Sequence, residues 1–287
     1  MKDANEAVSR FLNREPEWTF DGGLLLNVLT AMFRASGKEE YRRAALAFLE
    51  KNVSAEGAIL PTPANTLDLA ACGMALFFAL DETGEERYKK ALDAVAGCIM
   101  ERPLPNTPAG LYAVAPFLAE YDTRFGGKQA YKALAGQFKS VHQALFDQET
   151  GLYLSENRKF SLADEGFMLL SLADTAEKLD MQIYEHYRTL ADLLLEAVRI
   201  PYRKGKDILH FFPQEENGEE TLDLSGQAMM AAAMFKGVRL GILNEEKYLP
   251  LAMSGQGNLF ALYAAGISCE PGPWMLLLAE AEEVERS

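Results

Sequence analysis

Three segments of the sequence repeat one pattern, and this repeat restricts the possible folds more than any other feature. They are LTAMFRASGKEEYRRAALAFLEKNV from Leu29, ALFFALDETGEERYKKALDAVAGCI from Ala75 and LAEYDTRFGGKQAYKALAGQFKSVH from Leu118. Each contains the end of an apolar helix, a short glycine turn, a charged start with a tyrosine, and an amphipathic helix. The marker tyrosines Tyr41, Tyr88 and Tyr131 are 47 and 43 residues apart. A period of this length predicts a repeat architecture.

The repeat separates the helices into two kinds. Gly37, Gly84 and Gly127 stand where a helix end needs a left-handed residue. Six helices are apolar on nearly every side, and we expect them to begin near Asp21, Asp68, Ala109, Asp164, Asp223 and Glu270. Six amphipathic helices alternate with them, over residues 3–13, 38–53, 85–101, 128–146, 180–199 and 245–256.

A helix that is apolar on every side must be buried, so the first set predicts an inner ring and the second an outer ring. An open stack of repeats would need polar caps at both ends. The sequence therefore predicts an all-α fold, an (α/α)6 barrel or six-hairpin toroid, with residues 1–287 as a single domain and almost no β-structure. The longer loops all lead into the inner helices, so we expect the functional site in the bowl formed by the N-terminal ends of those helices.

Charge and composition exclude several classes of partner. The formal net charge is −14 at pH 7, and a field of this sign repels nucleic acid and anionic membrane surfaces. No stretch approaches eighteen uninterrupted apolar residues, and the first residues are charged throughout, so we expect a cytoplasmic protein without a membrane segment. The three cysteines, Cys72, Cys98 and Cys269, show no metal-type spacing and predict buried thiols. We expect neither a metal nor a cofactor, and the sequence leaves the oligomeric state open.

Several motifs carry a family resemblance over most of the chain. They are APFLAEY (115–121), LFDQETGLY (145–153), SGQAMMAAAMFKGVRLGIL (225–243) and EPGPWMLLLAEAE (270–282). The chain resembles the unsaturated glucuronyl and rhamnogalacturonyl hydrolases of glycoside hydrolase families 88 and 105. This resemblance implies an (α/α)6 barrel and an enzyme in which an Asp protonates the double bond of a Δ4,5-unsaturated uronate. Water then adds at C5, and the hemiketal collapses.

The chain departs from the family pattern where that Asp belongs. The resemblance places it at the start of the third inner helix, which here reads Asn106-Thr107-Pro108-Ala109-Gly110-Leu111-Tyr112. Ala109 therefore replaces the usual proton donor. A second family Asp is matched by Asp68. At the fourth inner helix, a family segment with an Arg aligns with Ala163-Asp164-Glu165-Gly166-Phe167, and the acids gained there would repel a uronate carboxylate.

Asp68 and Glu165 are the candidate catalytic pair. Asp68 matches a family position, and Glu165 is not needed as a helix cap if Asp164 already serves. Further acids, aromatic residues and one histidine near the inner-helix starts or on the loop from residue 201 are candidates for substrate binding: Asp21, Asp164, Tyr112, His210, Phe211, Asp223 and Trp274. Trp18, Phe20, Phe167 and Phe212 could complete an aromatic wall for a sugar. The competing interpretation is structural, because acids cap helices and aromatic residues fill cores.

Three functions remain open at this level. The first is a divergent glycoside hydrolase that acts on oligosaccharide fragments, with unsaturated uronyl saccharides as a candidate substrate, by acid-assisted hydration at a rearranged acid. The second is a catalytically inactive barrel that binds a glycan or a partner protein, because a fold can persist after a catalytic residue is lost. The third is a sugar epimerase-type enzyme. Such enzymes use histidines on inner helices, whereas His142 and His186 fall in predicted outer helices.

Overall fold

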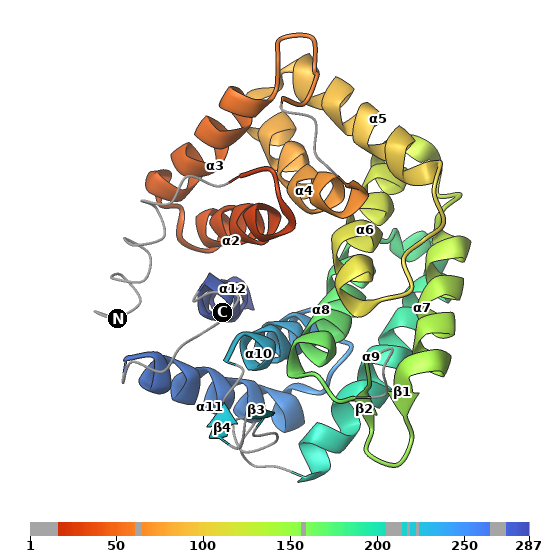
Figure 1. Ribbon diagram of the computed structural model, residues 1–287, viewed down its shortest axis with the longest axis vertical. Coiled ribbons are helices and arrows are strands. Elements are labelled where there is room, and N and C mark those ends of the chain that lie inside the picture. Colours follow the sequence, from red (N-terminus) through yellow and green to blue (C-terminus); the bar gives the residue numbers. More distant parts are fainter. Residues whose placement is uncertain are drawn as a thin grey trace.

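The computed structural model describes residues 17–60, 65–155, 159–204, 214–216, 219–221, 224–264 and 274–286. Within them, six helices form an inner ring (Figure 1). These are α2 (Phe20–Ser36), α4 (Thr66–Thr83), α6 (Pro108–Tyr121), α8 (Leu162–Lys178), α10 (Leu224–Arg239) and α12 (Trp274–Arg286). Each packs against the next, and α12 returns to pack against α2. The inner ring is therefore closed, as the sequence predicts.

Five helices lie outside this ring (Figure 1). They are α3 (Glu39–Asn52), α5 (Glu86–Met100), α7 (Tyr131–Leu145), α9 (Tyr184–Lys204) and α11 (Glu245–Ala264). All five match predicted outer helices, and the sixth predicted one, over residues 3–13, lies outside the described residues. The fold is an (α/α)6 barrel. No helix in the described part of the chain is both long enough and apolar enough to cross a membrane.

The marker residues of the repeat explain how each hairpin turns. Gly37 and Gly84 follow α2 and α4 with φ angles of 66° and 68°, the left-handed conformation that glycine adopts without steric cost. In the third hairpin a π-helical turn, η1 (Asp122–Gly126), comes between α6 and the corresponding Gly127. The chain then enters an outer helix whose marker tyrosine is buried. Tyr41, Tyr88 and Tyr131 are each at most 1% exposed, so each anchors an outer helix to the core.

The loops that lead into the inner helices contain the only described β-strands. Strand β1 (Phe146–Asp147) pairs antiparallel with β2 (Leu152–Tyr153), with Phe146 opposite Tyr153. Strand β3 (Gln214–Glu216) pairs with β4 (Glu219–Thr221) in the same way. A short 3-10 helix, η2 (Met181–Ile183), precedes α9. The expectation of buried thiols is right for Cys72 but wrong for Cys98, which lies on an exposed position of α5, and Cys269 lies outside the described residues.

A glycine permits the close packing of α2 against α4. A Cβ atom at Gly23 would lie 2.5 Å from the carbonyl carbon of Ala71 and 2.6 Å from its Cβ. We expect Gly23→Ala to lower the free energy of unfolding by about 1–3 kcal/mol, because the two helix backbones must separate. The measurement is urea unfolding.

The matched control is Gly97→Ala on α5, where an added Cβ meets nothing within 4 Å. This substitution should raise stability by about 0.5–1 kcal/mol, because alanine has the higher helix propensity. Equal effects at the two positions would contradict the close-packing argument.

Candidate active site

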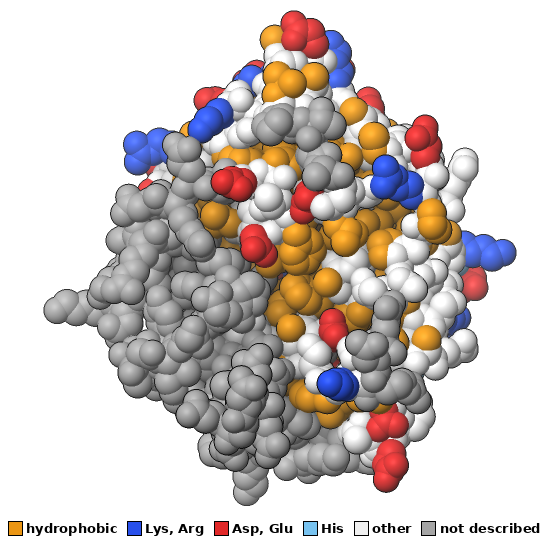
Figure 2. Space-filling view, in the orientation of Figure 1, with side chains coloured by type: hydrophobic (Ala, Val, Ile, Leu, Met, Phe, Trp, Pro, Cys, Tyr) orange, Lys and Arg blue, Asp and Glu red, His pale blue; other side chains and the backbone are white. Residues whose placement is uncertain are grey.

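Three aromatic rings meet on the axis of the barrel near the N-terminal ends of the inner helices. The ring centroids of Tyr112 and Phe167 are 5.4 Å apart, and Phe20 lies 5.6 Å from Phe167 and 6.4 Å from Tyr112. We call these three residues the aromatic cluster. Hydrophobic side chains also gather over the centre of the ring, with acidic side chains beside them (Figure 2). The aromatic cluster thus gives the bowl an apolar floor, and Phe20, its partly exposed member, offers a surface on which a sugar ring could stack.

Asp68 lies beside this floor and holds the starts of two inner helices together. Its Oδ1 accepts a hydrogen bond from the backbone N–H of Phe20 at 2.6 Å, and its Oδ2 accepts one from the Asn65 side chain at 2.6 Å. The Asn65 side chain in turn caps α4 by accepting from the Asp68 backbone N–H at 2.9 Å. The carboxylate is partly exposed. It therefore has a structural role and still borders the bowl.

The axial faces of α6 and α8 show which neighbouring positions reach the bowl. Ala109 and Asp164 each come three residues before a ring of the aromatic cluster, Tyr112 and Phe167 respectively. Residues three apart on a helix lie on one face, so both positions lie one turn beyond the contacting rings, toward the bowl. Both are partly exposed. Asp164 is thus the acid on α8 that shares a face with the aromatic cluster, and Ala109 leaves α6 without one.

Glu165 lies on a different face of α8. It is fully buried, and its Oε2 accepts a hydrogen bond from the backbone N–H of Tyr153 in β2 at 2.7 Å. Its Oε1 has no hydrogen-bond partner. Burial raises the pKa of this carboxyl to about 8. A protonated carboxyl suits a general acid, but the contacts point toward the β1–β2 hairpin, so its catalytic role stays a prediction.

The Glu165 pKa predicts how stability changes with pH. The folded value lies above the ordinary value of 4.5, so between about pH 4.5 and pH 8 the folded state holds a proton that the unfolded state has lost. Stability therefore falls as pH rises through this window, by up to about 1.4 kcal/mol per pH unit for this group.

In Glu165→Gln this loss should be absent, while the amide oxygen still accepts from Tyr153. We expect the variant to gain stability relative to the wild type from pH 5 to pH 8 in urea unfolding. Parallel pH profiles for the two proteins would show that the Glu165 carboxyl titrates normally.

The remaining candidates lie in different surroundings. Asp21 is exposed in the first turn of α2. Trp18 stacks on Phe48 of the outer ring, with centroids 5.6 Å apart, so it does not join the aromatic cluster. His210, Phe211, Phe212 and Asp223 lie outside the described residues, as does the side chain of Trp274, whose backbone begins α12.

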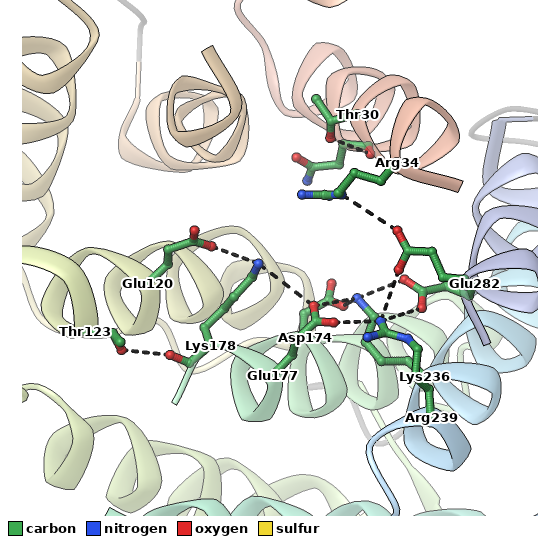
Figure 3. Close-up of polar contacts among 12 residues, drawn as sticks. Thr30, Arg34, Glu120, Thr123, Asp174, Glu177, Lys178, Lys236, Arg239 and Glu282 are labelled. Atoms are coloured by element: carbon green, nitrogen blue, oxygen red, sulfur yellow. Dashed lines mark hydrogen bonds and ion pairs between the residues drawn. The ribbon is translucent and has the colours of Figure 1, made fainter. Parts of the chain in front are cut away.

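A charged cluster at the opposite end of the axis was missed by the sequence analysis (Figure 3). Lys236 of α10 is buried, and its Nζ contacts Asp174 at 2.6 Å, Glu282 at 2.9 Å and Glu177 at 3.2 Å. Arg239 also contacts Glu177 at 2.6 Å and Glu282 at 2.9 Å. We call these five residues the ionic cluster. Its signal in the sequence was the presence of charges near the ends of otherwise apolar helices, in LADTAEK and AMFKGVR.

The described residues contain no group of three or more His, Cys, Asp or Glu side chains placed to hold a metal ion.

The family follows from the sequence match. The model of Glycosyl Hydrolase Family 88 matches residues 1–261. The chain belongs to this family. The family 88 chain is also similar in structure to several solved proteins, all of them less than 25% identical to it, so they bear on the fold alone.

One of these is a family 105 glycoside hydrolase from C. acetobutylicum ATCC 824. It has a TM-score of 0.81 and 21% identity over 99% of this chain and 98% of that one. A family 88 glycosyl hydrolase from Bacteroides vulgatus has a TM-score of 0.79 and 16% identity over 100% of this chain and 98% of that one. The unsaturated glucuronyl hydrolase of Bacillus sp. GL1, responsible for glycosaminoglycan degradation, has a TM-score of 0.57 and 14% identity over 94% of this chain and 86% of that one. These matches agree with the closed ring of helices.

Proposed function

We propose that this family 88 protein hydrolyses oligosaccharide fragments in the bowl, with Asp68 and Asp164 as its two working carboxylates. The observation that carries the proposal is the aromatic cluster with an acid on either side. Asp68 is hydrogen-bonded to the backbone of Phe20, and Asp164 lies one helical turn from Phe167. Two carboxyl groups about a sugar-binding surface are the usual machinery of glycoside hydrolysis.

The two acids have different surroundings, which suggests different roles. Asp68 accepts N–H hydrogen bonds on both oxygens, so it suits a fixed acceptor that positions water. Asp164 has its backbone N–H capped by the Ser161 hydroxyl at 3.2 Å and shares a face of α8 with Phe167, as Ala109 shares a face of α6 with Tyr112. We assign proton donation to Asp164, in place of the acid absent at Ala109. On an unsaturated uronide, Asp164 in its protonated, uncharged form would give its proton to C4, and Asp68 would take a proton from the water that adds at C5. The resulting C5 hemiketal would open to a C5 ketone and a C1 hemiacetal, whose breakdown releases the leaving sugar.

We prefer Asp164 to Glu165 for the second role because of burial. Glu165 is wholly covered, and its bonded oxygen faces Tyr153. A general acid must come within hydrogen-bond reach of the atom that it protonates. Among the described residues, Asp164 meets this condition better.

A second candidate function is a barrel that binds a saccharide without turnover, and Ala109 is the observation that favours it. At the position where the family resemblance places the proton donor, the side chain has no ionisable group. The aromatic cluster would still bind a sugar ring in such a protein.

The deciding experiment measures product release from Δ4,5-unsaturated uronyl disaccharides and from neutral disaccharides, together with ligand-induced shifts in melting temperature. Turnover of either class supports hydrolysis. Saturable thermal stabilisation without turnover supports the binding barrel, and Ala109→Asp should then raise product release from unsaturated uronides above the background. The absence of both turnover and binding would contradict both functions.

A further inference from the structure

A cavity of about 140 Å³ lies on the axis of the barrel at the end opposite the bowl. Side chains of all six inner helices line it, including one polar residue from each: Arg34, Asp81, Glu120, Asp174, Lys236 and Glu282. Figure 3 shows Thr30 and Arg34 of α2 across an open space from Glu120, Lys178 and Asp174. The cavity opens toward the short turns of the hairpins, where the side chains of Arg34 and Asp81 are 54% and 53% exposed.

The aromatic cluster separates this cavity from the bowl. Tyr112 belongs to that cluster and also lines the cavity, and its hydroxyl accepts a hydrogen bond from the Asn27 side chain at 3.3 Å. Tyr112 is only 4% exposed, and Phe167 only 7%. The cavity is therefore a compartment distinct from the proposed hydrolytic site.

Most of the charges that line the cavity are paired with one another, whereas Arg34 at the cavity mouth contacts Glu285, outside the lining, at 3.8 Å. Lys236 is held by three carboxylates of the ionic cluster, and Arg124 binds both oxygens of Asp81 at 2.7 and 2.8 Å. Glu120 contacts Arg124 at 2.7 Å and Lys178 at 2.9 Å. A charged ligand that bound to the buried part of this lining would have to break one of these pairs and leave its partner uncompensated. A neutral ligand needs no such exchange.

The paired groups retain capacity for hydrogen bonds with a neutral ligand. A carboxylate oxygen has more than one acceptor site, so the pairing does not saturate the acids of the ionic cluster. Asn27 donates one amide hydrogen to Tyr112, which leaves its second N–H and its carbonyl oxygen for other partners. Phe77 and Tyr112 border the cavity but are only 2% and 4% exposed, so polar groups dominate its accessible lining. Hydrogen-bonding groups spaced around a small cavity suit a polyhydroxylated ring.

We propose that this axial cavity is a binding site for a single neutral monosaccharide, separate from the bowl. Its volume is well below the roughly 300–1,000 Å³ of sites for drug-sized ligands, so it fits one sugar ring rather than an oligosaccharide. Hydroxyl groups of the sugar would bind the acids and Asn27.

The test is titration calorimetry of the full chain with D-glucose, D-galactose and L-rhamnose, and with D-galacturonate as the charged comparator. We expect at least one neutral sugar to bind with one-site stoichiometry, and galacturonate to bind at least 10-fold more weakly. Met74 lines the cavity outside the ionic cluster, so Met74→Phe should weaken the neutral sugar at least 10-fold. Ala31→Leu, which narrows the same cavity from α2, is the second blocking variant.

Two control variants distinguish binding in this cavity from binding in the bowl and from a nonspecific effect of the substitution on the fold. Met100→Phe makes the same change on an exposed outer-ring position and should leave affinity unchanged. Asp164→Asn alters the bowl and should also leave it unchanged. Loss of binding in Asp164→Asn with retention in both blocking variants would place the sugar in the bowl and overturn the proposal. Absence of binding by all three sugars, or tighter binding of galacturonate, would overturn it as well.

Discussion

Replacing Lys236 with methionine is expected to lower the free energy of unfolding at pH 7 by about 3–5 kcal/mol, because removal of the ammonium leaves its carboxylate partners without a counter-charge in a buried site. The Nζ of Lys236 lies within 3.2 Å of three carboxylates. Burial acts to lower the pKa of Lys236, but those carboxylates raise it well above its usual value. The ammonium is therefore charged throughout the working pH range, and methionine removes that charge while keeping much of the side-chain length.

The pH dependence of this loss has a definite sign. Burial acts to raise the pKa of Glu177, yet Lys236, Lys178 and Arg239 hold it well below its usual range. A carboxylate with a depressed folded pKa contributes stability that is present at neutral pH and lost as pH falls. Without Lys236 part of that contribution disappears, so the gap between wild type and variant should be constant from pH 7 to about pH 4.5, the ordinary value for this carboxyl, and should narrow from there toward about pH 3. Urea unfolding across this range measures it.

The matched control is Lys89→Met. Lys89 pairs with Asp93 at 2.5 Å on the outside of α5, where the two side chains are 25% and 46% exposed. An exposed pair contributes about 0–1 kcal/mol, so this variant should lose no more than that. Similar losses for Lys236→Met and Lys89→Met would show that the ionic cluster is as weakly coupled to folding as a surface pair.

Asp68→Asn is expected to reduce kcat/KM about 10²–10⁴-fold on any substrate that the wild type hydrolyses, the usual effect of losing a general acid or base. The amide keeps an oxygen that can accept from Phe20, so the start of α2 should stay in place. The NH₂ group of the new asparagine cannot accept the hydrogen bond that the Asp68 Oδ2 receives from the Asn65 side chain. A stability cost of about 1 kcal/mol is therefore expected.

Kinetics and unfolding must therefore be measured on the same preparation. A matched control is Asp93→Asn, which removes a carboxylate from the outer ring and should leave kcat/KM unchanged. An Asp68→Asn variant that is folded and retains full turnover would remove Asp68 from the mechanism, and a second test on Asp164→Asn would then examine the other acid alone.

The two rings of helices were predictable from the sequence because each repeat contains residues that mark where its helices end and begin. Gly37 and Gly84 mark left-handed helix ends, and Tyr41 and Tyr88 mark the buried starts of the outer helices. These are local signals that depend on one helix end at a time. The π-helical turn before Gly127 was not predicted, because it differs from an α-helical end by one hydrogen-bond register.

The candidate site was predictable only in part, because helix starts are simple to locate and helix faces are not. Tyr112 and Phe167 could be assigned to the bowl from the sequence, and the structure brings their rings together with that of Phe20. The sequence does not reveal that Glu165 faces the β1–β2 hairpin while Asp164 shares the face of Phe167. A neighbouring residue on a helix is rotated by about 100°, so an error of one position changes the surroundings entirely.

The ionic cluster escaped the sequence analysis for a related reason. Its five members come from α8, α10 and α12, and the spacing between helices in the chain carries no information about which faces meet on the axis. Only a known axial face, such as the one defined by Phe167 and Asp174, allows such residues to be found by counting turns.

The closure of the ring by α12 against α2 has a consequence for how the chain folds. Each neighbouring pair of inner helices can form from segments close in sequence, but the α12–α2 contact joins the two extremes of the described chain. Closing so long a loop costs more entropy than forming any hairpin, and contacts of this kind slow folding. During synthesis the growing barrel must therefore remain an open arc with two uncovered apolar edges until its last helix emerges. That interval is when aggregation competes with folding, and a chaperone would act there.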